Sequence, residues 1–398
     1  MPDATTAVAG TASVRDVRRR VAVVFGVHGL LFASWTAHIP HVKAALGLSN
    51  AGLGVALLGA PVGSVLAIVA GTPILTRVGS RRTIGPMLVG YALAGLAVGA
   101  ARSPLALAAA LALWGAFQGA LDVSMNTQGI AVQTQLGRPI MSGLHAAWSL
   151  GSFAGAGAGA LAVALGISLT DQLLVLGPLA AALALLTPGP LLSDRAPGHP
   201  SGGERRHVLR HPVVLLLGAI AFAAMLCEGA AADWSAVYLR SATAAAPGIA
   251  GLGYAAFAAA MFALRLSGDR VLARRPPRAV LPGLAALATA GMALALAVPS
   301  PATVLLGFAT LGAGVALVVP ASFSAAGRLP GLPPGTAIAA VSAIGWIGFV
   351  GGPPLIGRLA GLISLPAALG LVPALAAAIA LATRRVAAFG DSGSAGGA

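Results

Sequence analysis

The sequence predicts an all-α integral membrane protein with about twelve transmembrane helices. Hydrophobic residues make up 58% of the 398 residues, charged residues make up only 9%, and the mean hydropathy is +0.91. Soluble domains carry about 25% charged residues, so a soluble protein with a membrane tail is excluded. A chain of this length has room for about twelve spans of about 20 residues joined by short connections.

The expected helices are apolar runs separated by short polar, proline- or glycine-containing turns. In the first half the runs cover 18–39, 51–76, 84–101, 105–133, a fifth run that ends near 166, and 171–192. In the second half they cover 212–239, 247–266, 279–298, 302–326, 334–359 and 365–383. Glycine and proline recur within these runs, which membrane helices tolerate when neighbouring groups satisfy the freed backbone.

One clear break in composition separates the two sets of runs. The segment at 193–211, SDRAPGHPSGGERRHVLRH, is polar, basic and rich in Pro and Gly. We expect it to be a cytoplasmic linker between two six-helix halves, at 18–192 and 212–384. The terminal segments at 1–17 and 385–398 are expected to be disordered cytoplasmic tails.

Positive charge is distributed unevenly between the two sides of this layout. Of the 24 Lys and Arg residues, 20 fall in the tails, the linker and the connections on the same side as these. The other four are Lys43, Arg102, Arg240 and Arg358. This bias predicts a multi-pass protein of the cytoplasmic membrane with both termini in the cytoplasm. The net charge of +14 arises from these clusters, so we expect no nucleic-acid partner.

Motifs for catalysis and metal binding are absent from the sequence. Cys227 is the single cysteine and lies in an apolar run, which excludes an internal disulfide and a multi-cysteine metal site. No GxxxxGK[ST], HExxH or GxSxG motif occurs. We therefore expect no enzyme activity, no cofactor and no metal, and we expect a monomer in the lipid bilayer.

The most informative stretch is 118–152, QGALDVSMNTQGIAVQTQLGRPIMSGLHAAWSLGS. Gln118, Asp122 and Asn126 are spaced four apart, which places them on one face of the predicted fourth helix. An ionisable side chain at membrane depth costs at least roughly 2.5 kcal/mol, so this face is expected to line a substrate path. Asp122 is the main candidate for proton coupling or substrate binding. The alternative is a carboxylate held in a structural hydrogen bond.

The predicted fifth helix adds His145, Trp148 and Ser149. If helices four and five pair antiparallel about the turn near Gly137, Asp122 lies near Ser149, and a carboxylate–imidazole relay to His145 is possible. Trp148 is suited to stacking on a ligand ring and Ser149 to bonding a hydroxylated ligand. A packing role remains the alternative for His145 and Trp148.

Three further ionisable residues lie within apolar runs. His28 falls near the middle of the first run, where packing is the alternative to function. Glu228 is expected to line the cavity from the second half, with Asp233 nearer the outer mouth. Five residues apart on a helix, these two acids point about 140° away from each other, so we do not expect a carboxylate pair.

The two halves resemble each other in sequence. The second predicted helix of each half leads into a basic segment, TRVGSRR at 76–82 and RLSGDRVLARRPPR at 265–278. The fifth helix of each half carries glycines three to four residues apart, a spacing that lets helix backbones approach closely. Such duplication is typical of a transporter built from repeats around a site near the bilayer midplane.

These segments resemble the major facilitator superfamily. In that family the loop after helix 2 reads G-x-x-x-D-R/K-x-G-x-R/K-R/K, and its second half matches Arg77, Gly79, Arg81 and Arg82, with Thr76 replacing the acid. The corresponding loop of the second half retains an acid and an arginine, Asp269 and Arg270. The resemblance implies a charge network of these residues that holds the inward gate.

Within the superfamily, Asp122 followed by Asn126 resembles the fucose permease branch and its bacterial relatives. That branch also uses an acid in helix 1, whereas 21–37 contains none. We expect a secondary transporter that moves a small polar or neutral solute, sugar-like or drug-like, by alternating access. The driving force is a proton gradient acting through Asp122 or Glu228, or the solute gradient itself. Drug efflux and a non-transporting receptor or sensor remain alternatives.

Overall fold

The computed structural model of the protein describes residues 14–137, 140–187, 190–192 and 208–390. Most of the predicted linker and of both predicted tails lies outside these residues. Within the part described, twelve helical segments are long and apolar enough to span a membrane. The predicted number of spans is thereby confirmed.

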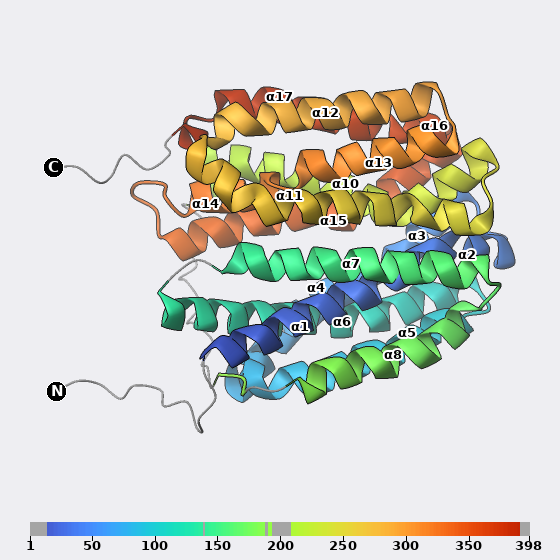
Figure 1. Cartoon of the computed structure of the whole chain (residues 1–398), viewed down its shortest axis with the longest axis horizontal. Coiled ribbons are helices and arrows are strands. Elements are labelled where there is room, and N and C mark those ends of the chain that lie inside the picture. The colour runs from blue at the N-terminus through green and yellow to red at the C-terminus, as the bar shows by residue number, and fades with distance from the viewer. Residues whose placement is uncertain (1–13, 138–139, 188–189, 193–207, 391–398) are drawn as a thin grey trace.

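The first half contains helices that run alternately in opposite directions (Figure 1). They are α1 (Val14–Ser34), η1 (Thr36–His38), α2 (Ile39–Ala45), α3 (Asn50–Leu57), α4 (Gly59–Val78), α5 (Ser80–Ala100), α6 (Pro104–Leu136), α7 (Met141–Ala164) and α8 (Leu169–Leu186).

The second half repeats this plan beside the first (Figure 1). It comprises α10 (Pro212–Thr243), α11 (Pro247–Arg274), α12 (Pro277–Ala297), α13 (Pro301–Val315), α14 (Val318–Ala326), α15 (Pro334–Leu362), α16 (Leu365–Leu369), α17 (Leu371–Arg385) and η2 (Ala387–Phe389).

Several boundaries differ from the predicted ones. α1 begins four residues earlier than predicted, α8 ends six residues earlier, and α11 continues for eight residues beyond 266. The predicted C-terminal tail is folded as far as Gly390, because η2 follows α17 and the Phe389 side chain is buried. Helix α11 extends because no helix breaker occurs before Pro276, whereas α4 stops at Gly79, whose φ of 81° favours glycine.

Rows of glycines where two helix backbones touch, which we call glycine seams, determine which helices pack together. α7 packs along α1 and not along α6, so the close pairing of the fourth and fifth helices, on which the expected proximity of Asp122 and Ser149 depends, is not formed. A methyl group on Gly151 would collide with the Gly26 carbonyl oxygen, and one on Gly155 would collide with that of Leu30. Because small residues allow such close backbone approach, the α7 glycines select α1 as their partner.

A second glycine seam joins α4 to α6. Methyl groups on Gly63 and Gly115 would collide with the backbones of Ala112 and Ala60, respectively. Helix α6 thus packs between α4 and α5, on the side of the half away from α7.

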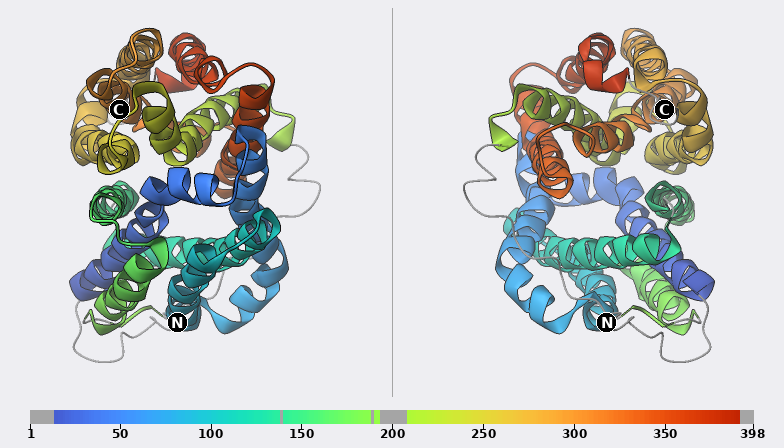
Figure 2. Two further views of the ribbon diagram at one scale, coloured as in Figure 1. Left: turned by 90° about the vertical axis from the view of Figure 1, so that its right-hand side faces the viewer. Right: turned by 90° about the vertical axis from the view of Figure 1, so that its left-hand side faces the viewer.

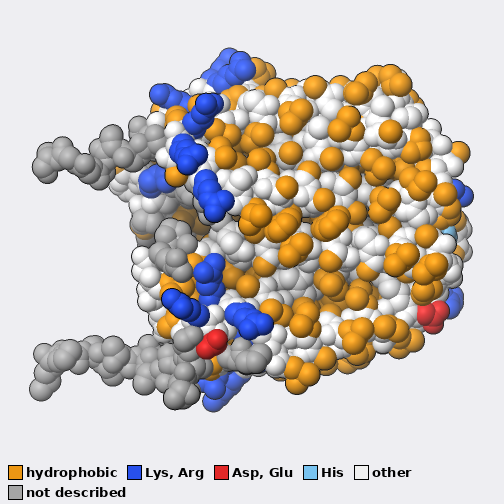
Figure 3. All heavy atoms as spheres, in the orientation of Figure 1, with side chains coloured by type: hydrophobic (Ala, Val, Ile, Leu, Met, Phe, Trp, Pro, Cys, Tyr) orange, Lys and Arg blue, Asp and Glu red, His pale blue; other side chains and the backbone are white. Residues whose placement is uncertain are grey.

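Charged side chains gather at the ends of the molecule, and the face shown in Figure 3 is apolar between them. Most of the blue side chains lie at the end where α1 begins and α17 ends, which we call the arginine-rich end. Figure 2 (right) views the molecule from this end. Its described arginines include Arg15, Arg77, Arg274 and Arg384.

The two halves contact each other at the end opposite the arginine-rich one. α15 packs along α3 but barely touches α4, η1 contacts α10 and α11, and α2 contacts α10. Close contact is possible because Gly54 of α3 lies directly against Pro353 and Gly357 of α15. Helices α7 and α11 also pack together across the two halves. The bundle is therefore closed at the end that carries Lys43 and Arg240.

Candidate functional site

The polar face predicted on the fourth helix is present on α6. Gln118, Asp122 and Asn126 are all partly exposed. Asn126 Nδ2 donates to the Asp122 carbonyl oxygen at 2.9 Å and to Asp122 Oδ1 at 3.3 Å. The carboxylate therefore has an amide donor from its own helix, as expected for a side chain that must be stabilised away from bulk water.

His28 and Trp148 are joined directly across the α1–α7 seam. Trp148 Nε1 donates to His28 Nδ1 at 2.8 Å, and the buried His28 ring stacks on Tyr91 with 5.5 Å between centroids. Because Nδ1 accepts this bond, it carries no proton while the bond persists. The contact holds the Trp148 ring in place, so the two residues form one unit.

The predicted relay between Asp122 and His145 is not formed. Among the described residues no hydrogen bond joins them, since α6 and α7 diverge from their connecting turn. His145 instead packs edge-on against Phe25 of α1, with ring centroids 5.4 Å apart. It lies within electrostatic range of His28 and Arg265, so it belongs to the α1–α7–α11 contact rather than to the α6 face.

Arg265 is a site residue that the sequence does not predict. It belongs to the basic segment at 265–278, which is expected to lie at the cytoplasmic end of a helix and to set the topology. It lies nine residues before the end of α11, or about 13 Å inside the helix, and is only partly exposed. The available signal was the segment RLSGDR, which begins with Arg265 itself and is followed by no proline before Pro276.

Arg265 joins the two halves. Its Nη1 donates to Ser149 Oγ of α7 at 2.8 Å, and its Nε donates to the Ala316 carbonyl oxygen at 3.3 Å. Ser149 in turn donates to the His145 carbonyl oxygen at 3.1 Å. The predicted site residue Ser149 therefore bonds a guanidinium of the second half.

A proline explains why the Ala316 carbonyl is available. The span made of α13 and α14 is interrupted at Ala316 and Leu317. Pro320 has no N–H, and its ring crowds the carbonyl four residues earlier, which is that of Ala316. Arg265 supplies a donor to this freed carbonyl, as buried backbone groups at membrane depth require.

The two acids of α10 are both partly exposed within the bundle. Glu228 lies within electrostatic range of Arg265, and Glu228 and Asp233 both lie within range of Tyr254. No described contact joins the two carboxylates, in agreement with the expected divergence along the helix. Glu228 is thus the acid positioned to balance the Arg265 charge.

Aromatic rings from both halves surround Phe32 of α1. Its ring centroid lies 5.8 Å from that of Trp148, 6.1 Å from that of Tyr254 and 6.3 Å from that of Phe349. The buried hydroxyls of Tyr254 and Ser152 interact with each other, and neither has a further hydrogen-bond partner in the described structure. Buried polar atoms normally have partners, so these hydroxyls are candidates for contact with a ligand.

The predicted gating residues occupy the arginine-rich end. Arg77 lies in the last turn of α4, Gly79 forms the break, and Arg81 and Arg82 lie in the first turn of α5. Arg270 lies on α11, so the second-half segment is helical and not the predicted loop. The side chain of Asp269 lies outside the described part of the structure, and the predicted charge network stays a prediction.

Comparison with known sequences identifies the family. The model of the Major Facilitator Superfamily matches residues 21–334. An uncharacterized MFS-type transporter of Yersinia pestis is 35% identical over 367 residues, which cover 92% of this chain and 94% of the relative. Membrane protein MosC of Rhizobium meliloti is 35% identical over 369 residues, covering 91% and 88% of the two chains.

Solved structures share the fold. The nucleoside transporter NupG matches with a TM-score of 0.70 at 10% identity, covering 93% of this chain and 98% of its own. FucP in the outward conformation matches with a TM-score of 0.60 at 17% identity, covering 93% and 99%. At these identities the likeness establishes the fold alone. Together with the family match, it shows that the chain belongs to the major facilitator superfamily, as a multi-pass membrane transporter.

Proposed function

We propose that the protein is a proton-coupled secondary transporter of a small polar or neutral solute, and that Arg265, Glu228 and Asp122 carry the coupling. The observation that supports this most directly is the hydrogen bond from Arg265 to Ser149. It crosses between the halves at membrane depth, beside an acid. Alternating access moves the halves relative to each other, so this bond differs between the two access states.

The charge balance around Arg265 suggests how protons act. A guanidinium at this depth requires a counter-charge, and Glu228 is within electrostatic range. When Glu228 is charged, it attracts Arg265 away from Ser149. When Glu228 takes up a proton, this attraction disappears, and Arg265 holds Ser149 and Ala316 more firmly. Proton uptake thereby favours one arrangement of the halves through a difference in contact energy.

The aromatic surroundings favour a solute with an apolar ring face and hydroxyl groups. Phe32 and Trp148 offer faces for stacking, while Tyr254 and Ser152 offer hydroxyls whose only partner among the described residues is each other. The partly exposed amides of Gln118 and Asn126 add donors and acceptors from α6. Sugar-like and drug-like solutes share these features.

The charge distribution supports the proposed orientation in the membrane. With the arginine-rich end in the cytoplasm, both termini lie there and the positive-inside rule is satisfied. The six-helix halves at 18–192 and 212–384 are the units that rock, and the linker at 193–211 joins them in the cytoplasm. One chain holds the complete site, so the working unit is a monomer.

Flux through the purified full chain in proteoliposomes tests this proposal. Two proteins of the same fold are a nucleoside transporter and a fucose:proton symporter, so uridine and fucose are the first labelled probes, with ethidium as the drug-like one. We expect one probe to accumulate when a pH gradient is imposed and not without it. Binding of a probe without flux would support a receptor instead.

Variants at Arg265 separate its role from general stability. Arg265→Ala should lower gradient-driven flux about 10- to 100-fold, since hydrogen bonds to charged groups contribute about 1.5–3 kcal/mol. Arg265→Lys keeps the charge but not the two-pronged geometry, so its flux should lie between that of the wild type and that of Arg265→Ala. Glu228→Gln should abolish accumulation while solute exchange continues. The matched control is Arg358→Ala, an exposed arginine of α15. Equal losses in Arg358→Ala and Arg265→Ala would contradict the assignment.

A further inference from the structure

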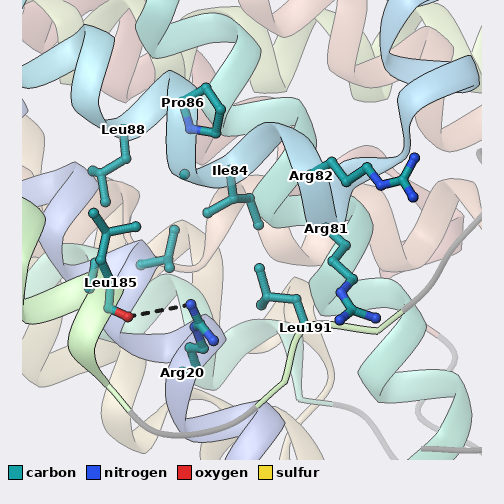
Figure 4. A pocket seen from close by; sticks show the side chains of 11 residues that line it. Arg20, Arg81, Arg82, Ile84, Pro86, Leu88, Leu185 and Leu191 are labelled. Carbon is teal, nitrogen blue, oxygen red and sulfur yellow. Dashed lines mark hydrogen bonds between the residues drawn. The ribbon is translucent and has the colours of Figure 1, made fainter. Parts of the chain in front are cut away.

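A pocket at the arginine-rich end lies apart from the central residues. It is enclosed by α1, α5, the end of α8 and Leu191, and its volume is about 160 Å³. Figure 4 shows Arg20 and Arg81 extending on either side of Leu191, with Arg82 pointing away from Arg20. Sites for drug-sized solutes occupy about 300–1,000 Å³, so this pocket is too small for a transported solute of that size.

The lining of the pocket is strongly positive. Arg20, Arg81 and Arg82 contribute to it, and no carboxylate is among the described residues that line it. Arg20 Nη2 donates to the Leu185 carbonyl oxygen at 3.5 Å, which holds its guanidinium at the pocket edge (Figure 4). Asp16, one turn earlier on α1, is the only acid of that helix. The exposed guanidinium groups of Arg81 and Arg82 complete the positive rim.

The position of two of these arginines is unfavourable for α5 itself. Arg81 and Arg82 occupy its first turn, where the helix dipole is positive, and that turn holds no acid. The N-cap is Gly79, which supplies no side-chain acceptor for the free N–H groups. An anion bound here would relieve the repulsion and accept from both the arginines and the helix terminus.

The remainder of the lining is apolar and continues into the lipid-facing surface. Ile84, Leu88 and Leu191 are buried against the pocket, whereas Leu185 is 41% exposed. Beyond it on the same helix, Leu186 is 79% exposed. The pocket therefore lies where an apolar edge meets the arginines. A free anion would gain nothing from this apolar edge, but a phospholipid would place its acyl chains along it.

We propose that this pocket binds the phosphate of an anionic phospholipid from the leaflet at the arginine-rich end. Arg20 and Arg81 bind the phosphate oxygens, and the acyl chains lie along α8 beside Leu185. Basic pockets between membrane helices on the cytoplasmic side are suited to such head groups. The lipid would hold α1, α5 and α8 together next to the connection between α4 and α5.

Native mass spectrometry of the detergent-solubilised full chain tests the proposal. Incubated with phosphatidylglycerol, the wild type should retain one molecule about tenfold more strongly than phosphatidylcholine, whose phosphate is neutralised by choline. The double variant Arg20→Ala/Arg81→Ala should retain phosphatidylglycerol about tenfold less strongly than the wild type and should therefore lose this preference. Arg81→Gln alone replaces an exposed side chain that the core does not need. It should lower the retention of phosphatidylglycerol about threefold.

The matched control is Arg274→Ala/Arg275→Ala, which removes two exposed arginines from the same end but outside the pocket. It should keep the wild-type preference. Equal loss in both double variants would mean diffuse attraction to the whole basic end and would overturn the site. Displacement of the lipid by millimolar inorganic phosphate would identify a site for free anions, and equal retention of phosphatidylcholine would remove the requirement for negative charge. Either result would overturn the lipid assignment.

Discussion

At the scale of single residues, Asp122 remains the clearest sequence-derived candidate. It is partly exposed on α6, and its only described hydrogen-bond partner is Asn126. Asp122→Asn preserves the size of the side chain and removes its ability to carry charge. We expect gradient-driven solute accumulation in proteoliposomes to fall about tenfold or more, equivalent to about 1.4 kcal/mol of lost coupling.

Asp171→Asn provides the control for Asp122→Asn. Asp171 is exposed in the first turn of α8, where its Oδ2 accepts from Ser168 Oγ at 2.7 Å. Loss of an exposed charge at a helix start costs at most about 1 kcal/mol of stability, so flux should remain within about twofold of wild type. Unchanged accumulation in Asp122→Asn would assign its carboxylate to a structural hydrogen bond.

Arg265 shows why residue roles are hard to read from one sequence. Its position near the end of an apolar run made it equivalent to the topological arginines, and only the continuation of α11 places it inside the bundle.

Gln128 is the opposite case, a polar residue of the most informative stretch that the structure buries away from a solute. It is as polar as Asn126, yet it is fully buried, donating to Ser80 Oγ at 2.7 Å and to the Leu192 carbonyl oxygen at 2.8 Å. Gln128 therefore fixes the chain after α8 and is not available to a solute.

At the scale of elements, the α1–α7 glycine seam positions Trp148 and Ser149. Gly151→Ala places a methyl group against the Gly26 carbonyl oxygen and should destabilise the protein by about 1–3 kcal/mol, as overpacking does. Gly157→Ala, on the same helix, meets nothing within 4 Å and should be neutral or stabilising. The measurement is the apparent Tm in detergent, compared between the two variants. Equal apparent Tm values would mean that α1 and α7 separate easily and that their glycine contacts do not determine the stability of the bundle.

At the scale of the whole molecule, closure opposite the arginine-rich end is directly testable. Ala51 of α3 and Gly361 of α15 belong to different halves, and a Cβ on Gly361 would lie 3.3 Å from that of Ala51. This separation is close to the about 3.5–4.5 Å that disulfides span, so Ala51→Cys with Gly361→Cys should cross-link on oxidation. The single native cysteine, the buried Cys227, is first replaced by Ala.

Oxidation of that double variant should stop flux, and reduction should restore it, because a linked pair of halves cannot alternate. Ala51→Cys alone should transport equally well under both conditions. Full flux through the cross-linked protein would show that the halves do not separate at this end during transport.

The sequence by itself determined the class of protein, the twelve spans, the predicted bias of charge and the family. These follow from hydropathy, helix length and the cost of placing charge in lipid, all of which act locally along the chain. The tertiary structure decided which polar residues meet. Glycine contacts place α7 against α1, Pro320 frees the Ala316 carbonyl, and Arg265 then joins Ser149 across the halves. Such contacts depend on helices distant in sequence, and the spacing of residues along one helix shows which face packs closely but not which helix packs against it.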